Sequence, residues 1–350
     1  MTINWDVPEG YKKLAYSVGT YGFLNRLLCL RNRDVMKRQL KARVMDRYPK
    51  KDRPYYPFPQ AISDFCFPSG LMLKTEEGSP EFFHFSLTDQ EGSLIYGTCL
   101  IFDEAPSEAL RQKLKSMYVR NTSSVRTLKA ICILSHYSFN AAFKQILMQL
   151  YRMQISTTKL TVPIERHITN IIEEIPLPDE GRLLVQHEIG GRTASFFRPT
   201  DQNPPVVDRE EIEILFRCLC VDSIIEIYTA LLLERKVLMV SKHKALLTQV
   251  INCFLSFMFP FQWKHPLIPI LPLGMVETLD APFPFLIGIE PTPLLDELDI
   301  EGDVIRVELD TGAVMVPNDQ LMGSHLPEMP FRERKALKAR LHKASEHLVE

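Results

Sequence analysis

Few residues of this 350-residue chain have the types and spacing of a catalytic, phosphate-binding or metal-binding motif. The sequence contains no G-x-x-x-x-G-K-[ST] or G-x-G-x-x-G phosphate loop, no G-x-S-x-G nucleophile turn and no H-E-x-x-H zinc motif. His187-Glu188 comes nearest to the zinc motif, but the fifth position is Gly191 and further ligands are absent. Cys218-x-Cys220 has no second cysteine pair or histidine cluster beside it, so we expect core packing there. The sequence therefore predicts no catalytic side chains, no metal and no cofactor.

One short polar turn carries residues suited to contact with another protein. Ser135-His136-Tyr137-Ser138 and Phe139 stand directly before a helical pattern over residues 140–152. Large aromatic side chains are frequent hot spots of protein interfaces. Tyr137, Phe139 and the adjacent His136 are therefore candidate partner-binding residues. The alternative is that the two aromatic rings only staple the helix to the sheet beneath it.

The element that must position this turn is a sheet with a helix packed on it. Phe83, Phe85 and Leu87 alternate with polar residues, and a polar turn at 89–93 leads into the apolar run 94–102. This alternation predicts an antiparallel hairpin. A third strand is expected at 130–134, immediately before the turn and the helix.

The second half of the chain has a different pattern. An amphipathic helix is expected between Pro163 and Pro176, and the glycine- and proline-rich stretch Gly190–Pro205 is interpreted as an exposed connection. Asp208 and Glu211 form a predicted capping box for the next helix. Helices then alternate with apolar strands, which predicts an α/β region with parallel strands covered on both faces. The expected elements are a helix reaching Glu234, strands at 237–240, 267–271, 283–289 and 304–309, and a helix at 244–258.

Charge is unevenly distributed along the chain. Residues 1–54 hold 13 Lys or Arg against 5 Asp or Glu, whereas residues 55–350 hold 28 against 38. The acidic balance of the larger part argues against nucleic-acid binding. The basic residues within 21–46 are interleaved with leucines and valines, which favours either an amphipathic helix on an anionic membrane or acidic partner, or a surface helix of its own domain.

The first residues and the cysteines indicate the cellular compartment, and the last residues form a predicted helix. The first residues, MTINWDVPEG, have neither a basic nor an apolar region of a secretory signal, so we expect a cytoplasmic protein. Seven cysteines scattered through apolar runs are expected to be reduced, mostly buried thiols. Residues 331–350 read as a helix without a stop signal, so we expect it to be cut off at the last residue.

Several ordered motifs resemble those of the DENN domain family, whose members are guanine-nucleotide exchange factors for Rab GTPases. The motifs extend over about residues 48 to 325. They are Tyr48-Pro49, Asp64–Gly70, Phe85–Thr88, Tyr96–Leu100, Ala230–Leu238, Phe259–His265, Ile268–Pro272 and Ala281–Ile289. Each also has a plain structural interpretation, since most of these residues are apolar or proline and suit a scaffold.

The resemblance implies a fold in two lobes. The first would be longin-like, an antiparallel sheet with helices, and the second a doubly wound α/β layer. The expected domains are a basic extension and linker at 1–54, an upstream lobe at 55–160, a central lobe at 161–322, and the start of a downstream helical segment at 323–350.

The resemblance also implies a function. The protein would promote GDP release from a Rab GTPase in membrane trafficking, without catalytic side chains of its own and with peripheral contact to an anionic membrane through residues 21–46. One alternative is a non-catalytic adaptor that binds a GTPase or a membrane. Another is a GTPase-activating protein that presents an arginine, for which Arg192 and Arg198 are the candidates.

Overall fold

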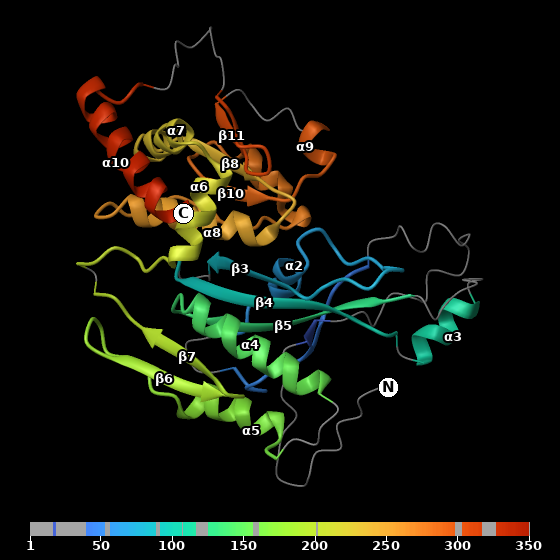
Figure 1. Ribbon diagram of the computed structural model, residues 1–350. Coiled ribbons are helices and arrows are strands. Elements are labelled where there is room, and N and C mark those ends of the chain that lie inside the picture. Colours follow the sequence, from blue (N-terminus) through green and yellow to red (C-terminus); the bar gives the residue numbers. More distant parts are fainter. Residues whose placement is uncertain are drawn as a thin grey trace. The chain divides into compact units, whose positions relative to one another are not determined.

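The computed structural model describes residues 17–18, 40–52, 57–88, 92–106, 108–116, 125–156, 161–200, 202–297, 303–316 and 327–349. The chain divides into two compact units. The first comprises Met1–Phe83 and Thr88–Phe197, and the second comprises His84–Leu87 and Arg198–Glu350. Figure 1 colours both units along the chain.

A five-stranded sheet forms the first layer of the first unit. Its order is β2 (Val44–Asp46), β1 (Ser17–Val18), β5 (Thr127–Ser135), β4 (Leu94–Glu104) and β3 (Glu81–Thr88). Strands β4 and β5 are antiparallel in an unbroken register from Tyr96 opposite Ser135 to Glu104 opposite Thr127. The expected antiparallel sheet is therefore confirmed, although residues 89–91 of the predicted turn lie outside the described residues. Two short helices, α2 (Ile62–Cys66) and α3 (Glu108–Ser116), complete this part of the chain.

Helix α4 (Asn140–Ile155) lies between this sheet and a small hairpin (Figure 1). The hairpin consists of β6 (Leu184–Ile189) and β7 (Arg192–Phe197), which pair in antiparallel register. Helix α5 (Ile164–Thr169) continues into a π-helical turn, η2 (Asn170–Glu174). The predicted helices at 140–152 and 163–176 are thus confirmed. The core shared by α4, α5 and the hairpin contains Ala142, Phe143, Ile146, Leu150, Ile164, Ile189, Ala194 and Phe196.

The hairpin corrects the interpretation of Gly190–Pro205 as an exposed connection. Gly190 and Gly191 have φ values of 57° and 74°, which suit a tight two-residue hairpin turn. From Arg192 onward the residues alternate, with Ala194 and Phe196 buried and the residues between them exposed. The prediction was wrong because two adjacent glycines mark a hairpin turn as readily as a loop.

A second correction concerns the end of the basic segment 21–46. Val44–Asp46 is strand β2, and the backbone N–H of Leu40 donates to the carbonyl oxygen of Leu71 at 2.6 Å. Sheet pairing therefore replaces the expected helix at these residues, as tertiary context often overrides an imperfect helical pattern. The rest of that prediction, residues 21–39, lies outside the described residues.

The second unit is built around a mostly parallel sheet. Its order is β12 (Ala313–Met315), β11 (Val304–Glu308), β8 (Lys236–Val240), β10 (Leu286–Ile289) and β9 (Leu267–Ile268). Strands β11, β8, β10 and β9 are parallel, as predicted, and β12 pairs antiparallel with β11. Strands β9 and β10 are shorter than expected because prolines interrupt both apolar runs. The helices are α6 (Arg209–Cys218), α7 (Val221–Leu232), α8 (Lys244–Phe257), the 3₁₀ segment η3 (Leu273–Asp280), α9 (Leu294–Glu297) and α10 (Phe331–Val349).

The central strands of this sheet are buried throughout. All four residues of β10 and Val237–Val240 of β8 are buried. Because successive side chains of a strand point to opposite faces, both faces of the sheet are covered at these strands. The backbone of β10 at Gly288 lies so close to the preceding loop that a Cβ added there would stand 2.2 Å from the carbonyl oxygen of Pro269. The capping box of Asp208 and Glu211 is present at the start of α6, as predicted.

The expectation of reduced, mostly buried thiols is confirmed for the described cysteines, but the expected core packing of Cys218-x-Cys220 is wrong. Cys218 is half-buried and Cys220 is exposed, because Cys220 stands at the start of α7, where its thiol caps the helix. Six are free thiols, and Cys66, Cys99, Cys132 and Cys253 are buried. Burial raises the pKa of Cys99 and Cys132, which keeps these thiols protonated. Within the described part of the chain, no helix combines the length and the apolar character needed to cross a bilayer.

Candidate partner-binding surface

The turn between β5 and α4 is held by its own backbone. The N–H of Tyr137 donates to Ser135 Oγ at 3.0 Å, and the N–H of Phe139 donates to the carbonyl oxygen of Tyr137 at 3.0 Å. Phe139 is the N-cap residue of α4, and no side chain caps the helix there. Since polar capping is missing at this end, packing of the Phe139 ring is what anchors the start of the helix.

Phe139 belongs to a cluster of three rings inside the first unit. Its ring centroid lies 5.3 Å from that of Phe196 and 6.0 Å from that of Phe143, both in edge-on arrangements. Phe143 and Phe196 are 5.9 Å apart. Such T-shaped contacts add to the free energy gained by burying the rings. The cluster ties the turn, α4 and β7 together.

Tyr137 lies on the outer side of this cluster. Its ring stacks on Phe139 with centroids 5.8 Å apart and planes inclined by 28°. Tyr137 and His136 are half-buried, so each keeps part of its surface exposed. Phe139 is half-buried too. The two aromatic candidates differ in their ring contacts, because Phe139 packs on Phe143 and Phe196 as well as on Tyr137.

The hairpin adds exposed apolar residues that sequence analysis missed. Leu184 and Phe197 face each other across the two strands, and they are 57% and 41% exposed. Both lie on the face opposite Ala194 and Phe196. Alternation over 184–197 was the signal that would have revealed them.

The inner face of the hairpin carries His187, which lies near His167 of α5. The pKa of His167 is lowered, mainly because the imidazole is partly buried and in addition because His187 is close by.

The two candidate arginines do not lie together. Arg192 is the exposed first residue of β7, next to the turn, whereas Arg198 follows the last residue of that strand and is half-buried. The strand rise of about 3.3 Å per residue places them roughly 20 Å apart. Arg198 already has an interaction within the chain. Of the two, Arg192 is the exposed arginine.

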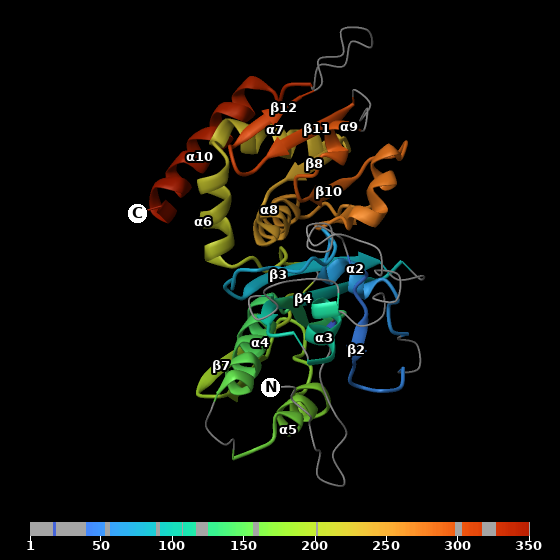
Figure 2. The ribbon, with the colours of Figure 1, turned by 90° about the vertical axis from the view of Figure 1, so that its right-hand side faces the viewer.

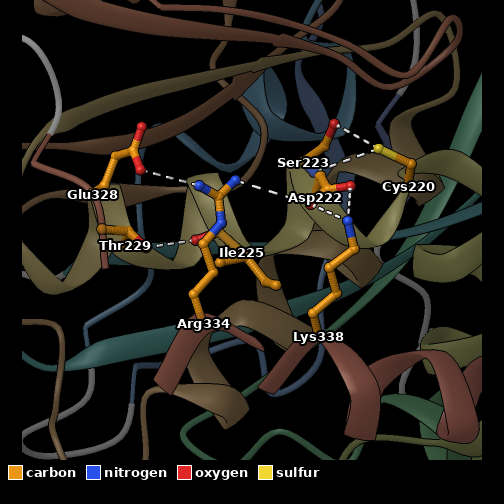
Figure 3. Close-up of polar contacts among 8 residues, drawn as sticks. All are labelled: Cys220, Asp222, Ser223, Ile225, Thr229, Glu328, Arg334 and Lys338. Atoms are coloured by element: carbon orange, nitrogen blue, oxygen red, sulfur yellow. Dashed lines mark hydrogen bonds and ion pairs between the residues drawn. The ribbon is translucent and has the colours of Figure 1, made fainter. Parts of the chain in front are cut away.

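A polar network joins α10 to α7 in the second unit (Figure 3). Lys338 Nζ lies 2.8 and 2.6 Å from the two carboxylate oxygens of Asp222. Arg334 approaches Asp222 at 3.9 Å and Glu328 at 3.5 Å. The hydrogen bond from Lys338 is the main cause that lowers the pKa of the Asp222 carboxyl. These contacts hold α10 against α7.

Cys220 stands at the edge of the same network. Its Sγ lies 3.2 Å from Ser223 Oγ and accepts from the Ser223 N–H at 3.4 Å, so the thiol caps the start of α7. The Ser223 side chain first, and then its backbone N–H, lower the pKa of Cys220. In the ranges that the structure describes, no three His, Cys, Asp or Glu side chains gather as a metal site would require.

Comparison with known proteins covers both units. A sequence model described as the DENN (AEX-3) domain matches residues 126–312, and one for the uDENN domain matches residues 42–102. The MAP kinase-activating death domain protein of Caenorhabditis elegans is 27% identical over 353 aligned residues, covering 86% of this chain and 25% of that protein. The chain therefore spans about a quarter of the length of this relative. Because the first match covers more than half of the chain and includes the aromatic turn and the parallel sheet, the chain belongs to the DENN domain family.

Proposed function

We propose that this protein is a guanine-nucleotide exchange factor for a Rab-family GTPase. The observation that carries the proposal is the match to uDENN and DENN domains over residues 42–102 and 126–312, since the family generally acts in this way. The polar groups described above serve to hold helices and turns in place. They suit a protein that acts through contact and makes or breaks no bond in the nucleotide.

Exchange of this kind is a binding reaction. The factor must hold the nucleotide-free GTPase more tightly than the GDP-bound form, and GDP then weakens the contact with the factor by the same coupling free energy. A GDP affinity in the picomolar range corresponds to about 16 kcal/mol, so several kcal/mol must come from contacts made only with the open form. Such contacts have to keep the switch regions away from the phosphates and the Mg²⁺ ion.

Tyr137 is the residue that we assign to this contact. Its ring is pre-positioned by stacking on Phe139, so little side-chain freedom is lost when a partner covers it. His136 precedes it in the same half-buried turn and adds a polar group beside the ring. Phe139 contributes from beneath, by holding the turn on the cluster of Phe143 and Phe196.

The direct test is the release of a fluorescent GDP analogue from a panel of GDP-loaded Rab GTPases. Addition of the chain should accelerate release from at least one of them by tenfold or more, that is about 1.4 kcal/mol or more in the activation free energy. Release rates that stay at their spontaneous values for every Rab in the panel would overturn the proposal.

Variants of the turn locate the contact. Tyr137→Ala should slow stimulated release by roughly tenfold or more, as expected for an interface hot spot. Tyr137→Phe keeps the ring and should retain most of the activity. Tyr137→Phe should keep the melting temperature, and Tyr137→Ala should lower it by only a few degrees, because the three-ring cluster beneath is unchanged. Equal release rates for Tyr137→Ala and the unaltered chain would remove Tyr137 from the interface.

The same assay separates the other functions. An adaptor would bind the GTPase equally well with GDP and without nucleotide, and GDP release would not accelerate.

A GTPase-activating protein would accelerate GTP hydrolysis, and Arg192→Ala would abolish this effect. Arg192 is the better placed arginine, because Arg198 is half-buried and already has a partner.

Several finer expectations belong to this proposal. They are a longin-like first lobe, a doubly wound second lobe, and the domain scheme of 1–54, 55–160, 161–322 and 323–350. They also include a cytoplasmic protein that acts in vesicle transport and contacts trafficking membranes peripherally. Residues 21–46 stay the proposed membrane contact of the amino-terminal part.

A further inference from the structure

Helix α10 carries a strong positive charge on an otherwise acidic unit. Residues 331–349 include six Lys or Arg and two Glu, whereas residues 55–350 as a whole hold 28 Lys or Arg against 38 Asp or Glu. Figure 2 shows α10 at the periphery of the second unit, with one side along α6 and α7. The cations of the helix fall into two sets with different surroundings.

The first set faces the protein. Residues 334, 337, 338, 341, 345 and 348 are the half-buried positions of α10, and their spacing is that of one helical face. Arg334 and Lys338 on this face are neutralised by Asp222 and Glu328. At the other end of the helix, Arg209 of α6 donates to the carbonyl oxygen of His347 at 3.3 Å. The inner face is therefore occupied, and it holds the helix at both ends.

The second set faces outward. Arg332, Lys335, Arg340 and Lys343 are all exposed. At 100° per residue they lie within one half of the helix surface, on the side opposite the half-buried positions. Among the described residues, none of these four cations forms an ion pair with a carboxylate within 4.0 Å. The rise of 1.5 Å per residue spreads them over roughly 16 Å.

We propose that this outer face of α10 is a docking surface for an anionic lipid bilayer. Its charge is complementary to that of acidic headgroups, and a planar surface can reach all four cations at once. Ala336 and Ala339 lie among them, so small side chains allow close approach. Phe331, the first residue of the helix, is 79% exposed and lies one turn before Lys335, at the edge of this face, where its apolar ring can enter the headgroup region.

This surface acts by electrostatic attraction, not by insertion of the helix. The apolar stripe of α10, which includes Leu337 and Leu341, is turned to α6 and α7, so it is not available to a bilayer while the helix is docked. Binding should therefore require anionic lipid and weaken as salt rises, because screening shortens the reach of the charges. The proposal adds a membrane contact in the second unit, and it does not depend on exchange activity.

The test is co-sedimentation of the full chain with vesicles. Vesicles of phosphatidylcholine with about 30% phosphatidylserine should bind the chain, and vesicles of phosphatidylcholine alone should bind it weakly. Each Lys or Arg at an anionic surface contributes about fivefold to partitioning, so replacing all four outer cations with Gln should weaken binding by about six-hundredfold. Phe331→Ser should weaken it further by a few-fold.

A matched control removes the same number of charges elsewhere. Lys115, Arg182, Lys242 and Lys264 are exposed cations on other elements, and their joint replacement with Gln should leave vesicle binding within about threefold of the unaltered chain. Two half variants protect the test against misfolding of the fourfold variant. Arg332→Gln with Lys335→Gln, and Arg340→Gln with Lys343→Gln, should each weaken binding by about 25-fold.

Three results would overturn the proposal. The first is absence of binding to the anionic vesicles at low salt. The second is equal binding by the outer-face variants and the matched control, which would move the contact to another basic part of the chain. The third is unchanged vesicle binding together with loss of a protein partner or of duplex DNA binding, which would give the surface a different occupant.

Discussion

The parallel sheet of the second unit and the hairpin of the first unit use their side chains in opposite ways. In the sheet, β10 and nearly all of β8 are buried, so both faces of each strand serve packing. In the hairpin, buried and exposed residues alternate along β7, so one face packs on α4 and the other is left for contact. A sheet covered on both sides builds a rigid scaffold, whereas the half-covered hairpin leaves exposed apolar residues such as Leu184 and Phe197 on its outer face.

Similar substitutions in the two regions should therefore lower the free energy of unfolding by different amounts. A change in β10 or in Val237–Val240 of β8 should damage stability wherever it falls, because no position there faces solvent. A change in the hairpin should depend on which face it touches. Three predictions test this difference, and a fourth, with the smallest expected effect, concerns an ion pair between two helices outside both regions.

The largest effect is expected at Gly288 in β10. Gly288→Ala places a methyl group 2.2 Å from the carbonyl oxygen of Pro269 and 3.2 Å from Leu247, and the first of these is backbone that cannot turn away. The free energy of unfolding should fall by about 4 kcal/mol or more in urea denaturation. Gly274→Ala is the control, since nothing lies within 4 Å of its Cβ, and it should change stability by less than about 0.5 kcal/mol. Similar values for both variants would contradict the close packing of the sheet.

The second effect separates the two faces of β7. Phe196 is 5% exposed and contacts Phe139 and Phe143, so Phe196→Ala should lower the free energy of unfolding by about 3 kcal/mol. Its neighbour Phe197 is 41% exposed, and Phe197→Ala should cost less than about 1 kcal/mol. The same denaturation measurement compares them, and equal losses would mean that the hairpin has no outer face.

The third effect lies in the hairpin turn. Gly190 has φ 57°, and an added Cβ would meet Gln149 Oε1 at 3.0 Å and Met153 Cε at 3.1 Å. These are ends of flexible side chains, so Gly190→Ala should cost about 1 to 2 kcal/mol, less than the change at Gly288. Gly191→Asn should be tolerated, because its surroundings are open and Asn accepts a positive φ. A loss at Gly190 as large as that at Gly288 would contradict the contrast between backbone and side-chain neighbours.

The smallest effect concerns the exposed ion pair of Asp222 with Lys338. The folded state lowers the pKa of Asp222, so its contribution is present above the ordinary carboxyl pKa of about 4 and is lost as the pH falls through the lower folded value. Asp222→Asn should lower the free energy of unfolding by about 0.5 kcal/mol at neutral pH, because the pair is largely solvated. The difference should vanish in strong acid. Glu277→Gln, an exposed carboxylate outside the network, should show no such pH-dependent loss.

The sequence allowed prediction of those elements whose signals are local. Alternation identified the strands before the aromatic turn, apolar runs between helices identified the parallel sheet, and Asp208 with Glu211 identified the start of α6. Each of these patterns reflects a period or a cap that a few neighbouring residues determine. The hairpin at 184–197 was not predicted, because its two adjacent glycines were interpreted as part of a loop.

The candidate surface could be predicted only in part. The turn before α4 was predicted as an element, but the packing of Phe139 depends on Phe196, which is distant in the sequence and contacts Phe139 in the fold. The contact of Lys338 with Asp222 joins residues 116 positions apart, and no local pattern indicates it. The π-helical turn depends on a bond from the Ile175 N–H to the carbonyl oxygen of Asn170, a choice that the helical period does not reveal.

The central claim is that the chain prefers a GTPase whose nucleotide site is empty. The most direct measurement compares the affinity of the chain for one responsive Rab in its nucleotide-free and GDP-bound forms, by titration at equal salt. The account predicts that the nucleotide-free form binds at least tenfold more tightly, and that added GDP displaces it from the chain. Equal affinity for the two forms across all Rabs that bind would contradict the account.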